Sequence, residues 1–183
     1  MAKHLYWYYE NVYSLKEIKK LNRTIEKVIK ERKIVYSDNA ASLSTKTSVV
    51  KVIPIQPIRH LLDSFITNAY EANEQNFNYH IYPLGLKTLN YNVYNPGTEY
   101  TWHVDKDNNA AFDMKLTCLL NCSEKPYKGG DFLLFEGKEL KVPEFQNPGS
   151  MVIFHSPMNH KVTPVTSGQR KTLTLWLNGP KLQ

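Results

Sequence analysis

The feature that most constrains the fold is a change in the sequence pattern near residue 77. From Phe77 to Leu177, short apolar or β-branched runs are separated by Gly, Pro and Asn, which is typical of many short strands. About eight short strands in succession predict a jelly-roll barrel. The predicted strands are Phe77–Tyr82, Thr88–Tyr94, Thr101–Asp105, Leu116–Cys122, Asp131–Phe135, Met151–Phe154, Lys161–Val165 and Lys171–Leu177.

The residues before this change have the pattern of two amphipathic helices. Ser14-Leu-Lys-Glu17 matches a capping box, and apolar residues then recur at helical spacing, which predicts a helix from about Leu15 to Arg32. A second helix is predicted from Ile58 to about Asn73, with Pro57 at its first turn. Aromatic or β-branched runs predict two further strands, at Leu5–Tyr13 and Ser48–Ile55.

Together these elements predict one domain of mainly β structure over residues 1–183. Its core, at about residues 76–180, is expected to be a double-stranded β-helix of the jelly-roll, cupin-like type. The helical support, at about residues 1–75, is expected to pack two helices on one sheet. A barrel of this kind can hold a small-molecule site between its sheets.

Composition gives expectations about location. No apolar run approaches the ~18 residues that a membrane span requires. The first residues lack the apolar core and cleavage site of a signal peptide, so a cytoplasmic location is expected. Cys118 and Cys122 are separated by about 13 Å along one predicted strand, which is too far for a disulfide. Both are therefore expected to be reduced thiols.

The net charge of +6 raises the question of nucleic-acid binding. Residues 16–33 hold eight Lys or Arg and three Glu, so this segment alone carries a net charge of +5, most of it in the first predicted helix. Aromatic residues do not alternate with these charges, as they would on a surface that stacks bases. A solvated helix face explains the charge better, and a nucleic-acid partner is not expected.

The sequence Thr101-Trp-His-Val-Asp105 has the spacing of a metal site. In an extended segment His103 and Asp105 project to the same side, about 6 to 7 Å apart at their backbones. Two imidazoles and one carboxylate form the facial triad of non-heme Fe(II) oxygenases, so a second histidine is needed. His160 is the main candidate, and His155 is the alternative. Arg170, ten residues beyond His160, offers a planar cation that can bind a carboxylate at two points.

These residues belong to a longer pattern that resembles a known family. The pattern is Tyr94-x-x-Gly97-x-x-Tyr100-x-x-His103-x-Asp105, then Lys128-Gly-Gly-Asp131, then His160-x-Val-x-Pro-Val-x-x-Gly-x-Arg170. It closely resembles the iron(II)- and 2-oxoglutarate-dependent dioxygenases, specifically their prolyl-4-hydroxylase-like branch, over roughly residues 88 to 179. The resemblance implies that His103, Asp105 and His160 bind iron and that Arg170 binds the distal carboxylate of 2-oxoglutarate.

Three further residues are expected at the cosubstrate. Tyr94 stands where the family commonly places a phenol against 2-oxoglutarate, with a core tyrosine as the alternative. Thr172 and Trp176 share a strand face with Arg170 and are expected to line the same cavity, although Trp176 is equally suited to packing in the core. The opposite face of this strand is expected to pack outside the cavity, through Leu173, Leu175 and Leu177.

The resemblance also implies the chemistry. Fe(II), 2-oxoglutarate and O2, with ascorbate as an optional reductant, would hydroxylate an unactivated C–H bond and release succinate and CO2. A prolyl residue in a peptide or protein is the expected substrate. The alternatives are a free amino acid, another small molecule or a nucleobase, a metal-dependent isomerase, and a non-catalytic metal-binding jelly-roll module. Specificity is expected from loops at residues 36–47, 83–87 and 106–112, which carry no recognisable motif.

Overall fold

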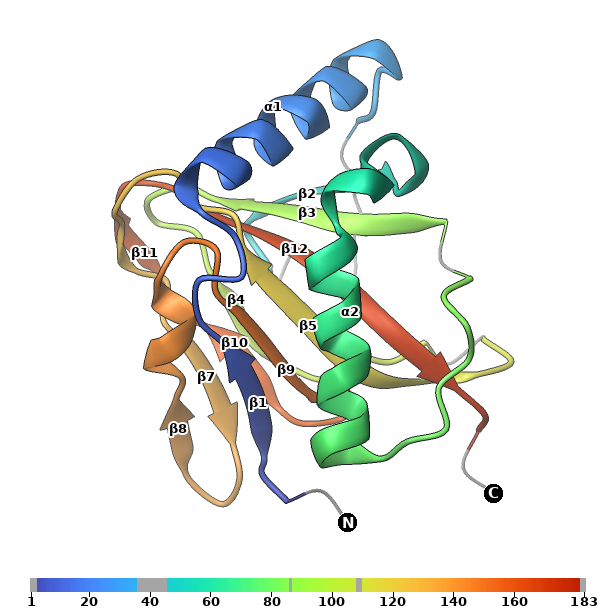
Figure 1. The fold of residues 1–183 in the computed structure, drawn as a ribbon. Helices are drawn as coiled ribbons and strands as arrows, with labels where there is room; N and C mark the ends of the chain where they lie inside the picture. The colour runs from blue at the N-terminus through green and yellow to red at the C-terminus, as the bar shows by residue number, and fades with distance from the viewer. Residues whose placement is uncertain (1–2, 36–45, 86, 108–109, 182–183) are drawn as a thin grey trace.

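A computed structural model describes residues 3–35, 46–85, 87–107 and 110–181 (Figure 1). Two α-helices, α1 (Leu15–Glu31) and α2 (Asp63–Ala72), accompany short helical turns at Gln56–Leu61, Asn73–Phe77 and Pro143–Gln146. The strands are β1 (Tyr6–Tyr9), β2 (Val49–Pro54), β3 (Thr88–Tyr94), β4 (Tyr100–His103), β5 (Asp113–Asn121), β6 (Lys128–Gly129), β7 (Phe132–Phe135), β8 (Glu139–Lys141), β9 (Met151–His155), β10 (His160–Val162), β11 (Val165–Ser167) and β12 (Arg170–Gly179).

The strands form two layers. A six-stranded antiparallel sheet has the order β1-β9-β5-β12-β3-β2, and a four-stranded sheet has the order β4-β10-β7-β8. Strands β6 and β11 pair separately. The helices cover one face of the six-stranded sheet, and the four-stranded sheet lies against its other face (Figure 1). This arrangement confirms the predicted mainly β jelly-roll with bracing helices.

Strand β12 shows how the alternating pattern separates the two layers. Leu173, Leu175 and Leu177 are buried in the apolar cluster beneath the helices, as predicted. Arg170 and Thr172 point to the other face, into a cavity between the two sheets. Because side chains alternate along a strand, one ten-residue segment supplies both the packing surface for the helices and one wall of the cavity.

Helix α1 begins where the sequence predicted. Ser14 accepts a hydrogen bond from the backbone N–H of Glu17, and the Glu17 carboxylate accepts one from the backbone N–H of Ser14. This reciprocal pair satisfies donors that have no partner inside the helix. The buried face of α1 packs on the sheet through Ile18, Leu21, Ile25 and Val28.

The prediction of a strand at Phe77–Tyr82 is wrong. Residues 73–77 form a π-helical turn after α2, and Asn78 has a left-handed backbone (φ 58°) that ends it. The Asn73 side chain then binds the backbone N–H and C=O of Tyr79, both at 2.9 Å. These contacts occupy backbone groups of Tyr79 that a strand would use, and residues 78–85 form no helix or strand.

Two further predicted elements are each divided into two in the structure. The second helix is divided at Leu62 into a 3-10 helix (Gln56–Leu61) and α2. The predicted strand Lys161–Val165 is two strands, β10 and β11, which belong to different sheets. Within the described residues, none of the helices is long and apolar enough to cross a membrane. Residues 36–45, most of one predicted specificity loop, lie outside the described part of the chain.

Candidate active site

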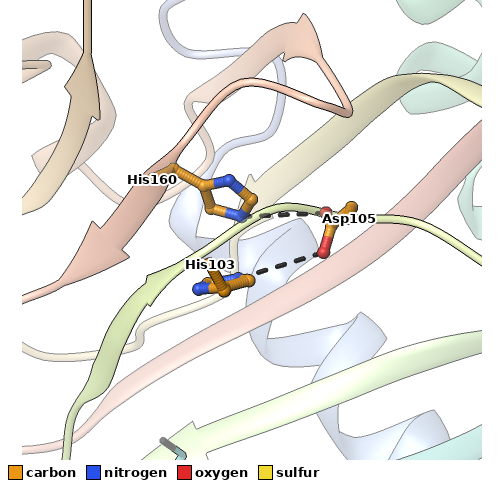
Figure 2. A group of neighbouring side chains, drawn as sticks. All are labelled: His103, Asp105 and His160. Atoms are coloured by element: carbon orange, nitrogen blue, oxygen red, sulfur yellow. Dashed lines mark ion pairs between the residues drawn. The ribbon is translucent and has the colours of Figure 1, made fainter.

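The pairing of β4 with β10 brings His103 and His160 together. These two residues are direct partners across the antiparallel pair, and their rings lie 4.0 Å apart at the centroids. Asp105, two residues beyond His103 and just past the end of β4, completes the group (Figure 2). Its carboxylate lies 3.9 Å from Nε2 of His103 and 3.7 Å from Nε2 of His160. One ligand atom from each of the three residues lies within 4.8 Å of the others.

Both imidazoles are oriented by the backbone. Nδ1 of His103 lies 2.7 Å from the carbonyl oxygen of Thr101, and Nδ1 of His160 lies 2.9 Å from that of Met158. Since a carbonyl only accepts, each Nδ1 must carry the proton and donate it. Each neutral ring therefore presents the lone pair of Nε2 toward Asp105, which is the form that binds a metal.

The carboxylate of Asp105 is held by two donors. Its Oδ2 accepts a hydrogen bond from the Thr117 hydroxyl at 2.8 Å and another from Nε1 of Trp176 at 3.0 Å. Its backbone N–H donates to the carbonyl oxygen of Ser156 at 2.9 Å. Trp176 therefore lines the cavity, which is one of the two positions predicted for it, and it contacts a member of the triad. Thr117 was not predicted, because nothing in the local pattern distinguishes it from a core threonine.

Burial keeps the two imidazoles neutral. It lowers the pKa of His103 to about 4, and the positive charge that His160 could carry adds to this effect. Burial also lowers the pKa of His160. Protons therefore compete weakly for the two Nε2 atoms at neutral pH.

A cavity between the sheets extends from the triad to Arg170. Both are among its lining residues, together with Tyr94, Thr172 and Trp176. Apolar side chains from both sheets also line it, including Leu119, Phe132 and Val162. All residues predicted to lie at the cosubstrate therefore line one cavity with the triad.

Arg170 is a buried cation, and no carboxylate of the described residues forms an ion pair with it. Its side chain is 1% exposed and lies over the rings of Tyr94 and Phe145, at 5.0 and 5.5 Å from the guanidinium carbon. Within the described residues, Nε and Nη2 have no hydrogen-bond partner. A buried charge of this kind is costly unless something pairs with it. The unsatisfied fork fits one carboxylate of a ligand in the cavity.

Tyr94 and Thr172 are placed by the pairing of β3 with β12. Tyr94 is the partner of Arg170 and Thr172 is the partner of Asn92. Tyr94 is 2% exposed, and burial raises the pKa of its phenol, so it remains protonated. The Thr172 hydroxyl lies 3.4 Å from Nδ2 of Asn92, which also donates to Thr174 at 3.0 Å.

One charged residue in this cavity was not predicted from the sequence. Lys46 lies at the end of the stretch predicted as a polar loop, and its amine points into the cavity. The amine donates to Oδ1 of Asn92 at 2.9 Å and lies 4.4 Å from the centre of the Tyr100 ring. Burial lowers the pKa of Lys46 to about 8. No local motif marks this lysine, because a backbone bridge to Tyr100, 54 residues later in the sequence, is what places it.

His155, the alternative to His160, lies outside the triad. Its Nδ1 is 2.8 Å from the Tyr79 hydroxyl, and its ring packs edge-on against Phe77 at 4.9 Å. His155 is the last residue of β9, and it contacts the segment that follows α2. Of the two candidate histidines, only His160 joins His103 and Asp105.

Comparison with known proteins agrees with this geometry. A family model described as the 2OG-Fe(II) oxygenase superfamily matches residues 89–178, which include the triad and Arg170. The chain belongs to the 2OG-Fe(II) oxygenase superfamily. A PKHD-type hydroxylase of Synechococcus sp. (strain CC9605) is 37% identical over 87 residues, which are 44% of this chain and 37% of that protein. This chain therefore matches only part of that relative's length.

Solved structures share the fold of this superfamily member. A Pseudomonas putida prolyl-4-hydroxylase superposes with a TM-score of 0.72 at 17% identity, over 98% of this chain and 95% of that one. A prolyl hydroxylase from Trichoplax adhaerens, in complex with a peptide fragment of a hypoxia inducible factor, has a TM-score of 0.67 at 18% identity, over 96% and 84%. Fe(II) and 2-oxoglutarate are the groups that the family's description names. The two imidazoles, the carboxylate and the unpaired guanidinium suit both.

The depressed pKa of His103 predicts how stability depends on pH. The unfolded chain binds a proton at His103 near the ordinary value of 6.5, whereas the folded protein binds it only near 4. In the metal-free protein, the contribution of His103 to the free energy of unfolding is therefore fully present above about pH 7. It is lost as the pH falls from about 6.5 to about 4. Each such proton contributes about 1.4 kcal/mol per pH unit.

His103→Gln, which cannot take up this proton, should make the dependence on pH shallower. Urea unfolding at half-unit steps of pH measures it, with His60→Gln on the exposed surface as the control that keeps the wild-type slope. An equally steep slope in His103→Gln would show that the imidazole is not kept neutral by the fold.

Proposed function

We propose that this chain is an Fe(II)- and 2-oxoglutarate-dependent oxygenase that hydroxylates a prolyl residue in a peptide or protein. The observation that carries the proposal is one buried cavity that joins two neutral imidazoles and a carboxylate to an unpaired guanidinium. The first three offer ligands on one side of a metal ion and leave the other positions open. The guanidinium offers two-point binding to a carboxylate.

In this proposal each residue has a defined part. His103, Asp105 and His160 bind Fe(II), and Arg170 binds the distal carboxylate of 2-oxoglutarate beneath Tyr94. Bound Fe(II), 2-oxoglutarate and O2 supply the chemistry, in which decarboxylation to succinate and CO2 accompanies hydroxylation of a C–H bond. Trp176 and Thr117 hold Asp105 in its ligating orientation. Leu119, Phe132 and Val162 give the cavity an apolar wall.

The prolyl substrate is supported by the relatives. The relatives named above are a PKHD-type hydroxylase and two prolyl hydroxylases, one of them in complex with a peptide. Helix α1, which carries much of the excess positive charge, lies on the helical side of the six-stranded sheet, away from the face that borders the cavity (Figure 1). A nucleobase substrate would be better served by a basic surface beside the metal. A peptide is therefore the favoured partner.

The cysteines support a cytoplasmic location, which we also propose. Cys118 and Cys122 are both free and buried on β5 and just beyond it. Burial raises the pKa of both thiols, that of Cys122 to about 12, so neither reacts readily. Buried thiols of this kind are suited to a reducing compartment.

The reaction itself tests the proposal. The protein, loaded with Fe(II) under air and supplied with 2-oxoglutarate and ascorbate, should add one oxygen atom to some members of a library of proline-containing peptides. Mass spectrometry detects the oxygen, and succinate should appear in equal amount. The same peptides with alanine in place of proline, and the His160→Ala variant, are the controls.

Two results would contradict the proposal in different ways. Succinate formation with free amino acids or nucleobases, but with none of the peptides, would replace the substrate class and keep the chemistry. Tight zinc binding without any 2-oxoglutarate turnover would favour a metal-binding module.

The contact between Trp176 and Asp105 gives a second prediction. Trp176→Phe removes the indole N–H from Oδ2 of Asp105 and leaves an aromatic ring in place. Loss of an outer partner of a metal ligand typically weakens metal binding about 10- to 100-fold. Titration with Mn(II) followed by electron paramagnetic resonance should show a loss in this range. Trp7→Phe on β1, far from the triad in sequence and sheet order, should bind like the wild type. Wild-type affinity in Trp176→Phe would remove this residue from the site.

A further inference from the structure

Lys46 lies at the seam where the two sheets meet. It forms an antiparallel bridge with Tyr100 on β4, the edge strand of the four-stranded sheet. The next residue, Thr47, donates its backbone N–H to the carbonyl oxygen of Glu99 at 3.1 Å and leads into β2, the edge of the six-stranded sheet. The backbone at Lys46 is therefore held by the edge of the four-stranded sheet and continues into the edge strand of the six-stranded sheet.

The Lys46 amine is held on the same wall as Arg170. It donates to Oδ1 of Asn92, whose Nδ2 is in turn directed at Thr172 and Thr174. On the face that lines the cavity, Asn92 and Thr172 are the next pair after Tyr94 and Arg170, two residues further along each strand. Two residues of a strand span about 6 to 7 Å. Strand β12 then continues to Trp176, which contacts the triad, so the amine lies between Arg170 and the triad.

The ring beneath the amine connects it to the triad as well. Tyr100 stacks on His103, with centroids 3.3 Å apart and ring planes 15° apart. Lys46 lies over that same Tyr100 ring. The lysine is therefore one aromatic ring away from one of the proposed metal ligands.

The amine has donors to spare. A lysine ammonium has three N–H groups, and within the described residues Asn92 is its one hydrogen-bond acceptor. A lysine with no ligand to bind would normally extend its charge into water. Arg170 and Lys46 instead place two cations in one cavity, where Asp105 is the single carboxylate among the lining residues that the structure describes. Two separate cations with open donors fit a ligand that has two carboxylates.

We propose that Lys46 is a positioning residue for 2-oxoglutarate, and that its ammonium binds the carboxylate next to the metal. Arg170 holds the carboxylate at the other end, because its two-point fork is already suited to one whole group. The inference rests on the proposed function. The proposal adds Lys46 as a second contact to 2-oxoglutarate. Contacts at both ends of the cosubstrate fix its orientation about the metal, whereas a contact at one end does not.

Calorimetry of 2-oxoglutarate binding to the Mn(II)-loaded protein tests this proposal without turnover. Lys46→Met, which keeps the length of the chain and removes the charge, should weaken binding about 10- to 100-fold. Lys46→Arg should recover part of the loss. Lys125→Met, which removes an exposed lysine, should bind like the wild type. Lys46→Gln, which keeps a donor for Asn92, replaces the Met variant if that variant does not fold.

A ligand with only one carboxylate identifies the carboxylate that Lys46 contacts. 2-Oxovalerate has the same carbon chain as 2-oxoglutarate but no distal carboxylate. Lys46→Met should weaken the binding of both ligands by the same factor, whereas Arg170→Ala should weaken only 2-oxoglutarate. Wild-type affinity for 2-oxoglutarate in Lys46→Met, or a loss confined to 2-oxoglutarate, would overturn the proposal. Failure of the wild-type protein to bind 2-oxoglutarate would instead refute the proposed function.

Discussion

The antiparallel pairing of β4 with β10 is the constraint on which the site depends. It sets His103 directly opposite His160, which is 57 residues later in the chain. The backbone carbonyls of Thr101 and Met158 then fix the two rings, so that both Nε2 atoms point to one place. Asp105 reaches the same place because its strand has already ended, and because Thr117 and Trp176 hold its carboxylate from the neighbouring sheet.

The protonation and charge of the buried side chains also prepare the site for its ligands. Burial between the two sheets keeps the imidazoles neutral, and among the described residues it leaves Nε and Nη2 of the Arg170 guanidinium without a partner. Both features cost stability in the empty protein and are repaid when a cation and a dianion bind. A larger apolar cluster, between the helices and the six-stranded sheet, contributes stability on the side of that sheet that faces away from the cavity.

The features that were readable from the sequence depend on local periodicity or spacing. The helix start at Ser14 and the two faces of β12 follow from neighbouring residues, and the His103, Asp105 and Arg170 spacing carries a family resemblance. Features set by individual contacts were not readable. Asn73 binds the backbone of Tyr79, six residues later, and leaves that segment irregular, and the bridge to Tyr100, 54 residues later, brings Lys46 into the cavity. Neither contact has a periodicity or a spacing that marks it in the sequence.

The most direct test of the account is a crystal structure of the protein with Mn(II) and 2-oxoglutarate, with the metal located by anomalous scattering. The account predicts one peak bound by Nε2 of His103, Nε2 of His160 and the Asp105 carboxylate, with a carboxylate of the cosubstrate on the Arg170 guanidinium. A peak at any other place, or a metal closed off by a fourth protein ligand with the cavity empty, would contradict it.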